Sequence, residues 1–177
     1  MNYAKALLAI SAAVQLGACS TYGSIPTERV GSATLAFGNG LPAGTVQLLS
    51  DGETVTMGVA ATGLEPGAHG FHLHTTGKCE SPGFQSAGGH LNPAGREHGS
   101  ENPAGKHLGD LPNLVANDAG RATAQYDLPG SASSVLEDIF DADGTAVVIH
   151  AGPDDYRSDP AGDAGSRVAC GVIKAAG

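Results

Sequence analysis

Short apolar runs separated by turn residues recur along the chain from about residue 31 onward. This pattern is typical of an all-β sandwich or barrel. Residues 45–49 and 54–59 predict two strands, and the Asp51-Gly52 pair between them favours a tight hairpin turn in which both central residues take positive φ. The sequence contains no long amphipathic helical repeat and no internal repeat, so we expect a single β-rich domain.

Further strands are predicted toward the C-terminus. Residues 111–115 and 122–126 flank an Asn-Asp-Ala-Gly turn and are expected to pair with each other. Residues 145–150 are rich in β-branched side chains, which is typical of a buried strand, and residues 168–173 predict a final strand. A short helical turn is expected at residues 134–140. The remaining chain forms two long loops.

These two loops, at residues 75–110 and 151–166, are where we expect function, because rigid scaffolds commonly present functional residues on loops. The stretch from residue 86 to 110 is rich in Gly, Pro and Asn, and it has no helical or strand periodicity. A long ordered loop of this kind needs something to hold it, and a bound metal ion is a natural candidate.

Histidines are concentrated at the ends of the predicted strands and in the first loop. In Gly70-Phe71-His72-Leu73-His74, the two-residue strand period places both imidazoles on one face. Imidazole suits copper and zinc, and one added carboxylate suits zinc. Six imidazoles and one carboxylate predict a site for two metal ions: His72, His74, His90, His98, His107, Asp110 and His150. The seventh histidine, His69, is interpreted as a hydrogen-bonded barrel residue.

The N-terminus has the organisation of an export signal. Lys5 supplies the positive charge, residues 6–14 form an apolar stretch too short to span a membrane, and small residues follow. Residues 16–19, Leu-Gly-Ala-Cys, resemble the lipobox of bacterial lipoproteins, in which the cysteine carries the lipid. We expect residues 1–18 to be cleaved and Cys19 to anchor an exported, periplasmic or envelope protein to a membrane. Simple release after cleavage is the alternative.

Residues 19–30 are mostly polar and predict a tether, followed by one domain at residues 31–177. The formal net charge of −9 argues against nucleic acid as a partner. Of the three cysteines, lipidation of Cys19 leaves Cys79 and Cys170, for which a disulfide is expected in an oxidising compartment. The bridge would close a ring of about ninety residues, worth about 4 to 5 kcal/mol. A metal-ligand role for Cys79 is the alternative.

Four segments, in order along the chain, carry a resemblance to a known family. The chain resembles the copper-zinc superoxide dismutases, specifically the exported bacterial branch, from roughly residue 30 to 174. The matching motifs are Gly70-Phe71-His72-Leu73-His74, Gly88-Gly89-His90-Leu91-Asn92-Pro93, His107-Leu108-Gly109-Asp110-Leu111 and Gly165-Ser166-Arg167-Val168-Ala169-Cys170-Gly171-Val172-Ile173.

The resemblance implies an eight-stranded Greek-key β-barrel with one copper and one zinc ion per chain. Copper is expected on His72, His74, His90 and His150, and zinc on His90, His98, His107 and Asp110, with His90 bridging the two. The implied reaction converts two superoxide anions and two protons to oxygen and hydrogen peroxide, with copper cycling between Cu(II) and Cu(I) while zinc is structural.

Two further roles follow from the same resemblance. Arg167 matches the anion-guiding arginine at the copper mouth, for which a surface ion pair is the alternative. Asp154, four residues after His150, matches a carboxylate that hydrogen-bonds one copper and one zinc histidine, for which a solvated loop position is the alternative. A homodimer is possible, but the segment between Cys79 and His90 is shorter than the insertion that contributes to the dimer contact in some exported members. Non-enzymatic metal binding and a purely structural lipoprotein remain as competing functions.

Overall fold

The structure is a computed structural model and describes residues 28–177. The predicted export signal at residues 1–18, the lipidation site Cys19 and the tether as far as residue 27 lie outside the described residues. The tether was predicted to extend to residue 30, whereas the first strand begins at Glu28.

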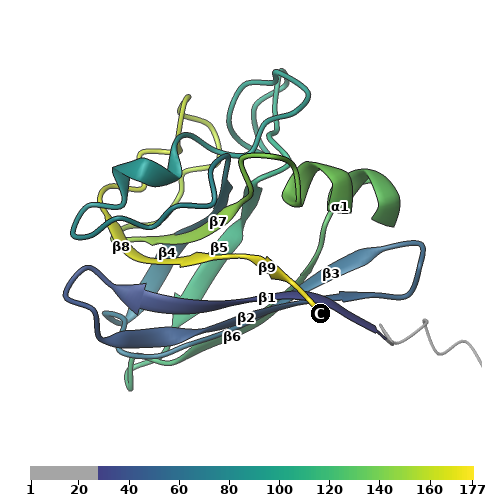
Figure 1. The fold of residues 1–177 in the computed structure, drawn as a ribbon. Coiled ribbons are helices and arrows are strands. Elements are labelled where there is room, and N and C mark those ends of the chain that lie inside the picture. The colour runs from purple at the N-terminus through teal and green to yellow at the C-terminus, as the bar shows by residue number, and fades with distance from the viewer. Residues whose placement is uncertain (1–27) are drawn as a thin grey trace, which may run out of the picture.

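Eight antiparallel strands form a nearly closed barrel in the order β5-β4-β7-β8-β1-β2-β3-β6, drawn as two layers in Figure 1. The connections from β3 to β4 and from β6 to β7 join strands that are not neighbours, which gives the expected Greek-key arrangement. The strands are β1 (Glu28–Phe37), β2 (Pro42–Ser50), β3 (Val55–Ala61), β4 (Gly67–His74), β5 (Asp110–Ala116), β6 (Ala122–Asp127), β7 (Ala146–His150), β8 (Arg167–Val172) and the short β9 (Lys174–Ala175), which pairs with β1.

The predicted hairpin between β2 and β3 is confirmed, but its turn is wider than predicted. Ser50 pairs with Val55, so four residues form the loop. Gly52 takes a positive φ of 93°, while the Asp51 carboxylate accepts hydrogen bonds from the backbone N–H groups of Glu53 and Thr54 at 2.9 and 2.8 Å. A carboxylate that binds the backbone ahead of it stabilises this longer loop without requiring positive φ at both positions.

The predicted pairing of β5 with β6 is wrong. Within residues 28–177 these strands are the two ends of the sheet: β5 pairs with β4, and β6 pairs with β3. The turn between them is closed by a hydrogen bond from Asn117 N to Arg121 O at 2.9 Å. The Greek-key order places β5 beside β4 and β6 beside β3, so the open seam of the barrel lies between the sequence neighbours β5 and β6.

Alternate residues of the strands fill the barrel interior. Phe71 and Leu73 of β4 pack there with Val147 and Ile149 of β7, and all four are fully buried. The opposite faces of β4 and β7 are also buried, because the long loops cover them (Figure 1). Burial on both faces explains the continuous apolar run of β7. It also creates an enclosed layer between barrel wall and loops.

The predicted helical turn is α1 (Ala132–Ile139), which begins two residues earlier than expected because the Ser131 side chain accepts a hydrogen bond from Ser134 N. A 3-10 turn, η1 (Gln85–Ala87), lies in the first loop. In the part of the chain that the structure describes, no helix has the length and apolarity needed to cross a membrane.

Candidate metal centre

Strands β4 and β7 deliver three of the predicted ligands to the enclosed layer. His72 and His74 lie on the face of β4 opposite Phe71 and Leu73, as the strand period predicts, and both are fully buried. His150 ends β7, which pairs with β4 in antiparallel register. The barrel therefore fixes the relative positions of these three imidazoles.

The first loop brings His90 to β4 through backbone hydrogen bonds. Leu91 N donates to Leu73 O at 2.8 Å, and Leu73 N donates to Gly109 O at 3.0 Å, so both ends of the ligand-bearing segment contact the strand. Gly109 has to be glycine, because a Cβ at this position would collide with the carbonyl of Leu73. The loop is thus positioned against β4 by its own backbone.

Four imidazoles form a first cluster, in which each residue offers a nitrogen within 4.8 Å of the others: His72, His74, His90 and His150. The Nδ1 atom of His72 and the Nε2 atoms of His74, His90 and His150 are buried and have no hydrogen-bond partner. An unsatisfied buried polar atom costs about 1 to 3 kcal/mol, so four of them at one point require an explanation. A metal ion with nitrogen ligands fits them.

The second nitrogen of each of the three strand histidines is occupied. His74 Nδ1 donates to Gly88 O at 3.0 Å, and His150 Nδ1 donates to Gly165 O at 3.1 Å. His72 Nε2 lies 2.8 Å from Asp154 Oδ2. Because a neutral imidazole carries one proton, these contacts place the lone pair on the nitrogen that faces the cluster.

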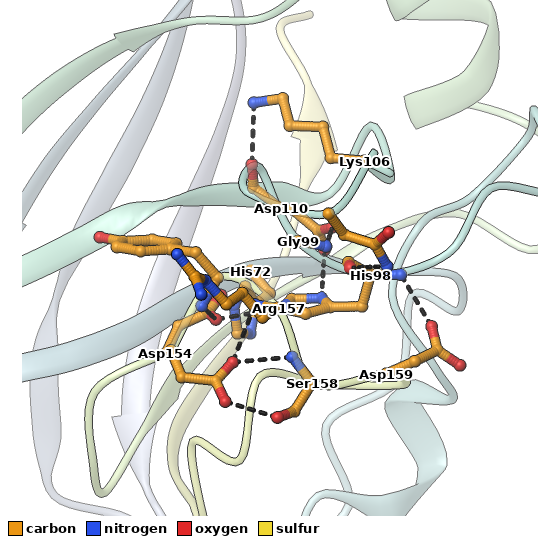
Figure 2. Close-up of polar contacts among 12 residues, drawn as sticks. His72, His98, Gly99, Lys106, Asp110, Asp154, Arg157, Ser158 and Asp159 are labelled. Atoms are coloured by element: carbon orange, nitrogen blue, oxygen red, sulfur yellow. Dashed lines mark hydrogen bonds and ion pairs between the residues drawn. The ribbon is translucent and has the colours of Figure 1, made fainter. Parts of the chain in front are cut away.

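A second cluster forms around Asp110, the first residue of β5. The Nδ1 atoms of His90, His98 and His107 lie 2.8, 3.0 and 3.1 Å from Asp110 Oδ1. Asp110 Oδ2 accepts hydrogen bonds from Gly99 N and His107 N, both at 3.0 Å, and Lys106 Nζ donates to its backbone oxygen (Figure 2). Three nitrogens and one carboxylate oxygen are a typical tetrahedral zinc set.

Asp154 connects the two clusters. Its Oδ2 atom lies 2.8 Å from His72 Nε2 and its Oδ1 atom lies 3.0 Å from His98 Nε2, and the side chain is buried. Two hydrogen bonds with the side chain of Asn113 fix the Asp154 backbone. The alternative of a solvated loop position for Asp154 is therefore wrong. The carboxylate holds one histidine of each cluster.

The electrostatics of the two clusters differ. Burial lowers the pKa of His74 to about 2 and that of His150 to about 3, and burial together with neighbouring imidazoles lowers the pKa of His90 to about 4. Burial also opposes the charge of His98, but hydrogen bonds to Asp110 and Asp154 outweigh it and raise its pKa to about 9. Three of the first-cluster imidazoles are thus neutral at pH 7, as metal ligands must be.

A cavity opens onto the first cluster and is lined by His74, His90, His150 and Arg167. The half-buried Arg167 donates to Phe84 O at 2.7 Å and to Gly88 O at 2.6 Å, so its guanidinium is fixed at the mouth. The alternative of a surface ion pair for Arg167 is wrong. The cavity also contains Arg96, which sequence reasoning did not single out.

The remaining predictions concern Cys79, Cys170 and His69. Cys79 and Cys170 form a disulfide with a Cα–Cα distance of 5.7 Å, which confirms the expected pairing and excludes Cys79 as a metal ligand. The buried His69 lies 2.7 Å from His150 O and 2.8 Å from Glu65 O, which confirms that it is a hydrogen-bonded barrel residue.

A Greek-key barrel that carries two adjoining histidine clusters, with His90 in both, defines a two-metal protein of the β-barrel class. A family model described as copper/zinc superoxide dismutase (SODC) matches residues 42–173. The chain belongs to the copper/zinc superoxide dismutase family. It is accordingly an enzyme of that class, an oxidoreductase that acts on superoxide with copper and zinc as cofactors.

Individual relatives agree with this assignment. Superoxide dismutase (Cu-Zn) 2 of Aquifex aeolicus is 46% identical over 134 residues, which cover 74% of this chain and 78% of the relative. Superoxide dismutase (Cu-Zn) of Caulobacter vibrioides is 39% identical over 176 residues, 95% of this chain and 100% of the relative. The crystal structure of a SOD-like protein from Bacillus subtilis has a TM-score of 0.74 at 37% identity and covers 80% of this chain and 96% of that one.

Proposed function

We propose that dismutation takes place at the first cluster, with copper held by its four histidines and zinc held by the cluster around Asp110. The observation that carries this proposal is the set of four buried nitrogens without partners, one from each expected copper ligand. The proposed copper ligands are His72, His74, His90 and His150, and the proposed zinc ligands are His90, His98, His107 and Asp110.

The reaction converts two superoxide anions and two protons to one oxygen and one hydrogen peroxide. Copper, when bound, supplies the one-electron change between Cu(II) and Cu(I) that the two half-reactions need, and zinc has no redox role. The protein must supply the ligand geometry, a proton and a route for an anion.

His90 is the proposed proton carrier. Its Nδ1 atom faces Asp110 in the second cluster, and its Nε2 atom faces the first cluster without a hydrogen-bond partner. With Nδ1 facing Asp110, Nε2 would take up one proton in the half-reaction that releases oxygen and give it to the peroxide formed in the other, while solvent at the cavity supplies the second proton.

Arg167 and Asp154 have supporting roles in this proposal. Two of the five N–H groups of Arg167 bind backbone carbonyls, which leaves the other donors available to an anion at the mouth. Asp154 orients His72 and His98 through their Nε2 atoms, and such contacts outside the ligand set tune metal affinity.

The test is to measure metal content and superoxide removal on the same purified protein after loading with copper and zinc. We expect about one copper and one zinc per chain with activity, and loss of copper and activity together in His150→Ala. His69→Gln is a matched control, because His69 is a buried histidine outside both clusters. Stoichiometric metal without turnover in the unmodified protein would favour the competing function of metal binding.

We further propose that the protein is exported, that residues 1–18 are removed and that lipidated Cys19 anchors it in the periplasm or cell envelope. The Cys79–Cys170 disulfide supports an oxidising compartment. Membrane fractionation of cells expressing the unmodified chain and Cys19→Ala tests the anchor. Fractionation of both proteins with soluble periplasmic material would instead support simple release after cleavage.

A further inference from the structure

Arg96 lies in the cavity that opens onto the first cluster, together with Arg167. The residue is exposed. Its hydrogen bonds are made by its own backbone N–H and carbonyl groups. Within residues 28–177 its guanidinium forms no hydrogen bond or ion pair. A full positive charge with freedom to move is therefore present at the entrance.

The backbone of Arg96 is held firmly even though its side chain is free. Asn92 binds both its N–H and its carbonyl, at 2.9 and 2.8 Å. The same carbonyl accepts a hydrogen bond from His107 Nε2 at 3.1 Å. His107 belongs to the second cluster, so the position of Arg96 at the mouth depends on the zinc side of the site.

The other cationic side chains around the site are held in place by protein partners, although Arg167 keeps its remaining donors free toward the cavity. Arg167 binds two backbone carbonyls, Lys106 binds the carbonyl of Asp110, and Arg157 pairs with Glu101. The carboxylate of Asp159, at the same mouth as Arg96, accepts a hydrogen bond from His98 N at 2.7 Å. Since the chain carries a net charge of −9, an incoming anion needs a local positive charge such as Arg96.

We propose that Arg96 is a second guidance residue, which attracts superoxide to the mouth while Arg167 receives it at the first cluster. This inference rests on the proposed function. A unit charge about 10 Å from the path of a monoanion in water changes its local concentration by about two-fold at low salt, and by much less at about 0.15 M, where the Debye length is about 8 Å.

The test compares Arg96→Gln and Arg96→Glu with the conservative variant Arg96→Lys. Arg121→Gln is the matched control, because it makes the same charge change in the exposed turn after β5, at the end of the barrel away from Asp110. Pulse radiolysis gives the second-order rate constant with superoxide at about 0.01 and 0.15 M ionic strength. An optical titration of the copper- and zinc-loaded proteins with azide, also a monoanion, gives a dissociation constant that does not depend on turnover.

At low salt we expect the rate constant to fall about two-fold in Arg96→Gln and about four-fold in Arg96→Glu, with Arg96→Lys and Arg121→Gln near the unmodified value. Azide should bind correspondingly more weakly, and both differences should shrink at the higher salt. Equal effects of Arg96→Gln and Arg121→Gln, or a loss that does not change with salt, would overturn the proposal. If the loaded protein binds azide but does not remove superoxide, the proposed function fails, while the azide series still tests Arg96.

Discussion

Removal of the disulfide by Cys79→Ser together with Cys170→Ala is predicted to lower the free energy of unfolding by about 4 to 5 kcal/mol. The bridge joins residues separated by 91 positions. The chain-entropy model gives about 15 cal/mol/K for a ring of that size, or about 4.6 kcal/mol at 25 °C. Alanine is chosen at Cys170 because this residue is buried in an apolar cluster, where a hydroxyl would lack a partner.

The assay is thermal and urea unfolding of the metal-free protein, because metals that bind only the folded state would add their own stabilisation. For a domain of this size each kcal/mol shifts Tm by about 2 to 4 °C, so Tm should fall by about 9 to 18 °C. The unmodified protein under strong reductant serves as a control and should behave like the double variant.

The same change should affect the mouth of the site. The segment that follows Cys79 provides the carbonyls of Phe84 and Gly88, which hold Arg167, and the Gly88 carbonyl also holds His74. We therefore expect weaker azide binding in the copper- and zinc-loaded variant. A Tm within about 3 °C of the unmodified protein would refute the loop-closure argument, since it corresponds to only about 1 kcal/mol.

Three further predictions concern the metal centre. Asp154→Asn should weaken metal binding about 10- to 100-fold in competition with a chelator, because each carboxylate oxygen accepts from a different histidine and the amide replaces one of them by a donor, whereas the exposed Asp155→Asn should leave affinity unchanged. Gly162→Ala should lower zinc content at equal expression, since φ is +65° there and a Cβ would collide with Asp154 and His98. In the metal-free protein, the pKa of His98 near 9 lies above its value of 6.5 in the unfolded chain, so its stabilisation is complete below pH 6.5 and is lost as pH rises toward 9. The free energy of unfolding, measured with urea, should decrease between pH 6.5 and 9 in the unmodified protein and should not show this decrease in His98→Gln. A free energy that stays constant over this range in the unmodified protein would contradict the prediction.

The sequence predicted which residues gather at the candidate metal centre better than it predicted the strand pairing. Strand alternation placed His72 and His74 on one face, and the β-branched run before His150 indicated a buried strand, which the structure shows to be buried on both faces. These are local properties that follow from the two-residue strand period. Pairing is not local: β5 and β6 are adjacent in sequence and flank a well-formed turn, yet β5 pairs with β4 across the first long loop and β6 pairs with β3.

Backbone acceptors also escaped prediction, because a carbonyl leaves no trace in residue type. The carbonyls of Gly88 and Gly165 orient His74 and His150, and that of Arg96 accepts from His107. Their positions depend on loop conformation, which has no periodicity to read. Arg96 was missed for a related reason. An arginine in a polar loop looks like any solvated residue in the sequence, and only the fold places it at the cavity.

These carbonyl and carboxylate contacts explain why the centre is defined before metal binds. Each of the three strand histidines has one nitrogen held by an oxygen acceptor, so the other nitrogen is directed at the cluster with its lone pair. His90 differs, because its two nitrogens face different clusters. A ligand set that is already oriented loses little side-chain entropy when metal binds. Since His90 and Asp154 each join the two clusters, a disturbance of the second cluster is expected to alter the geometry of the first.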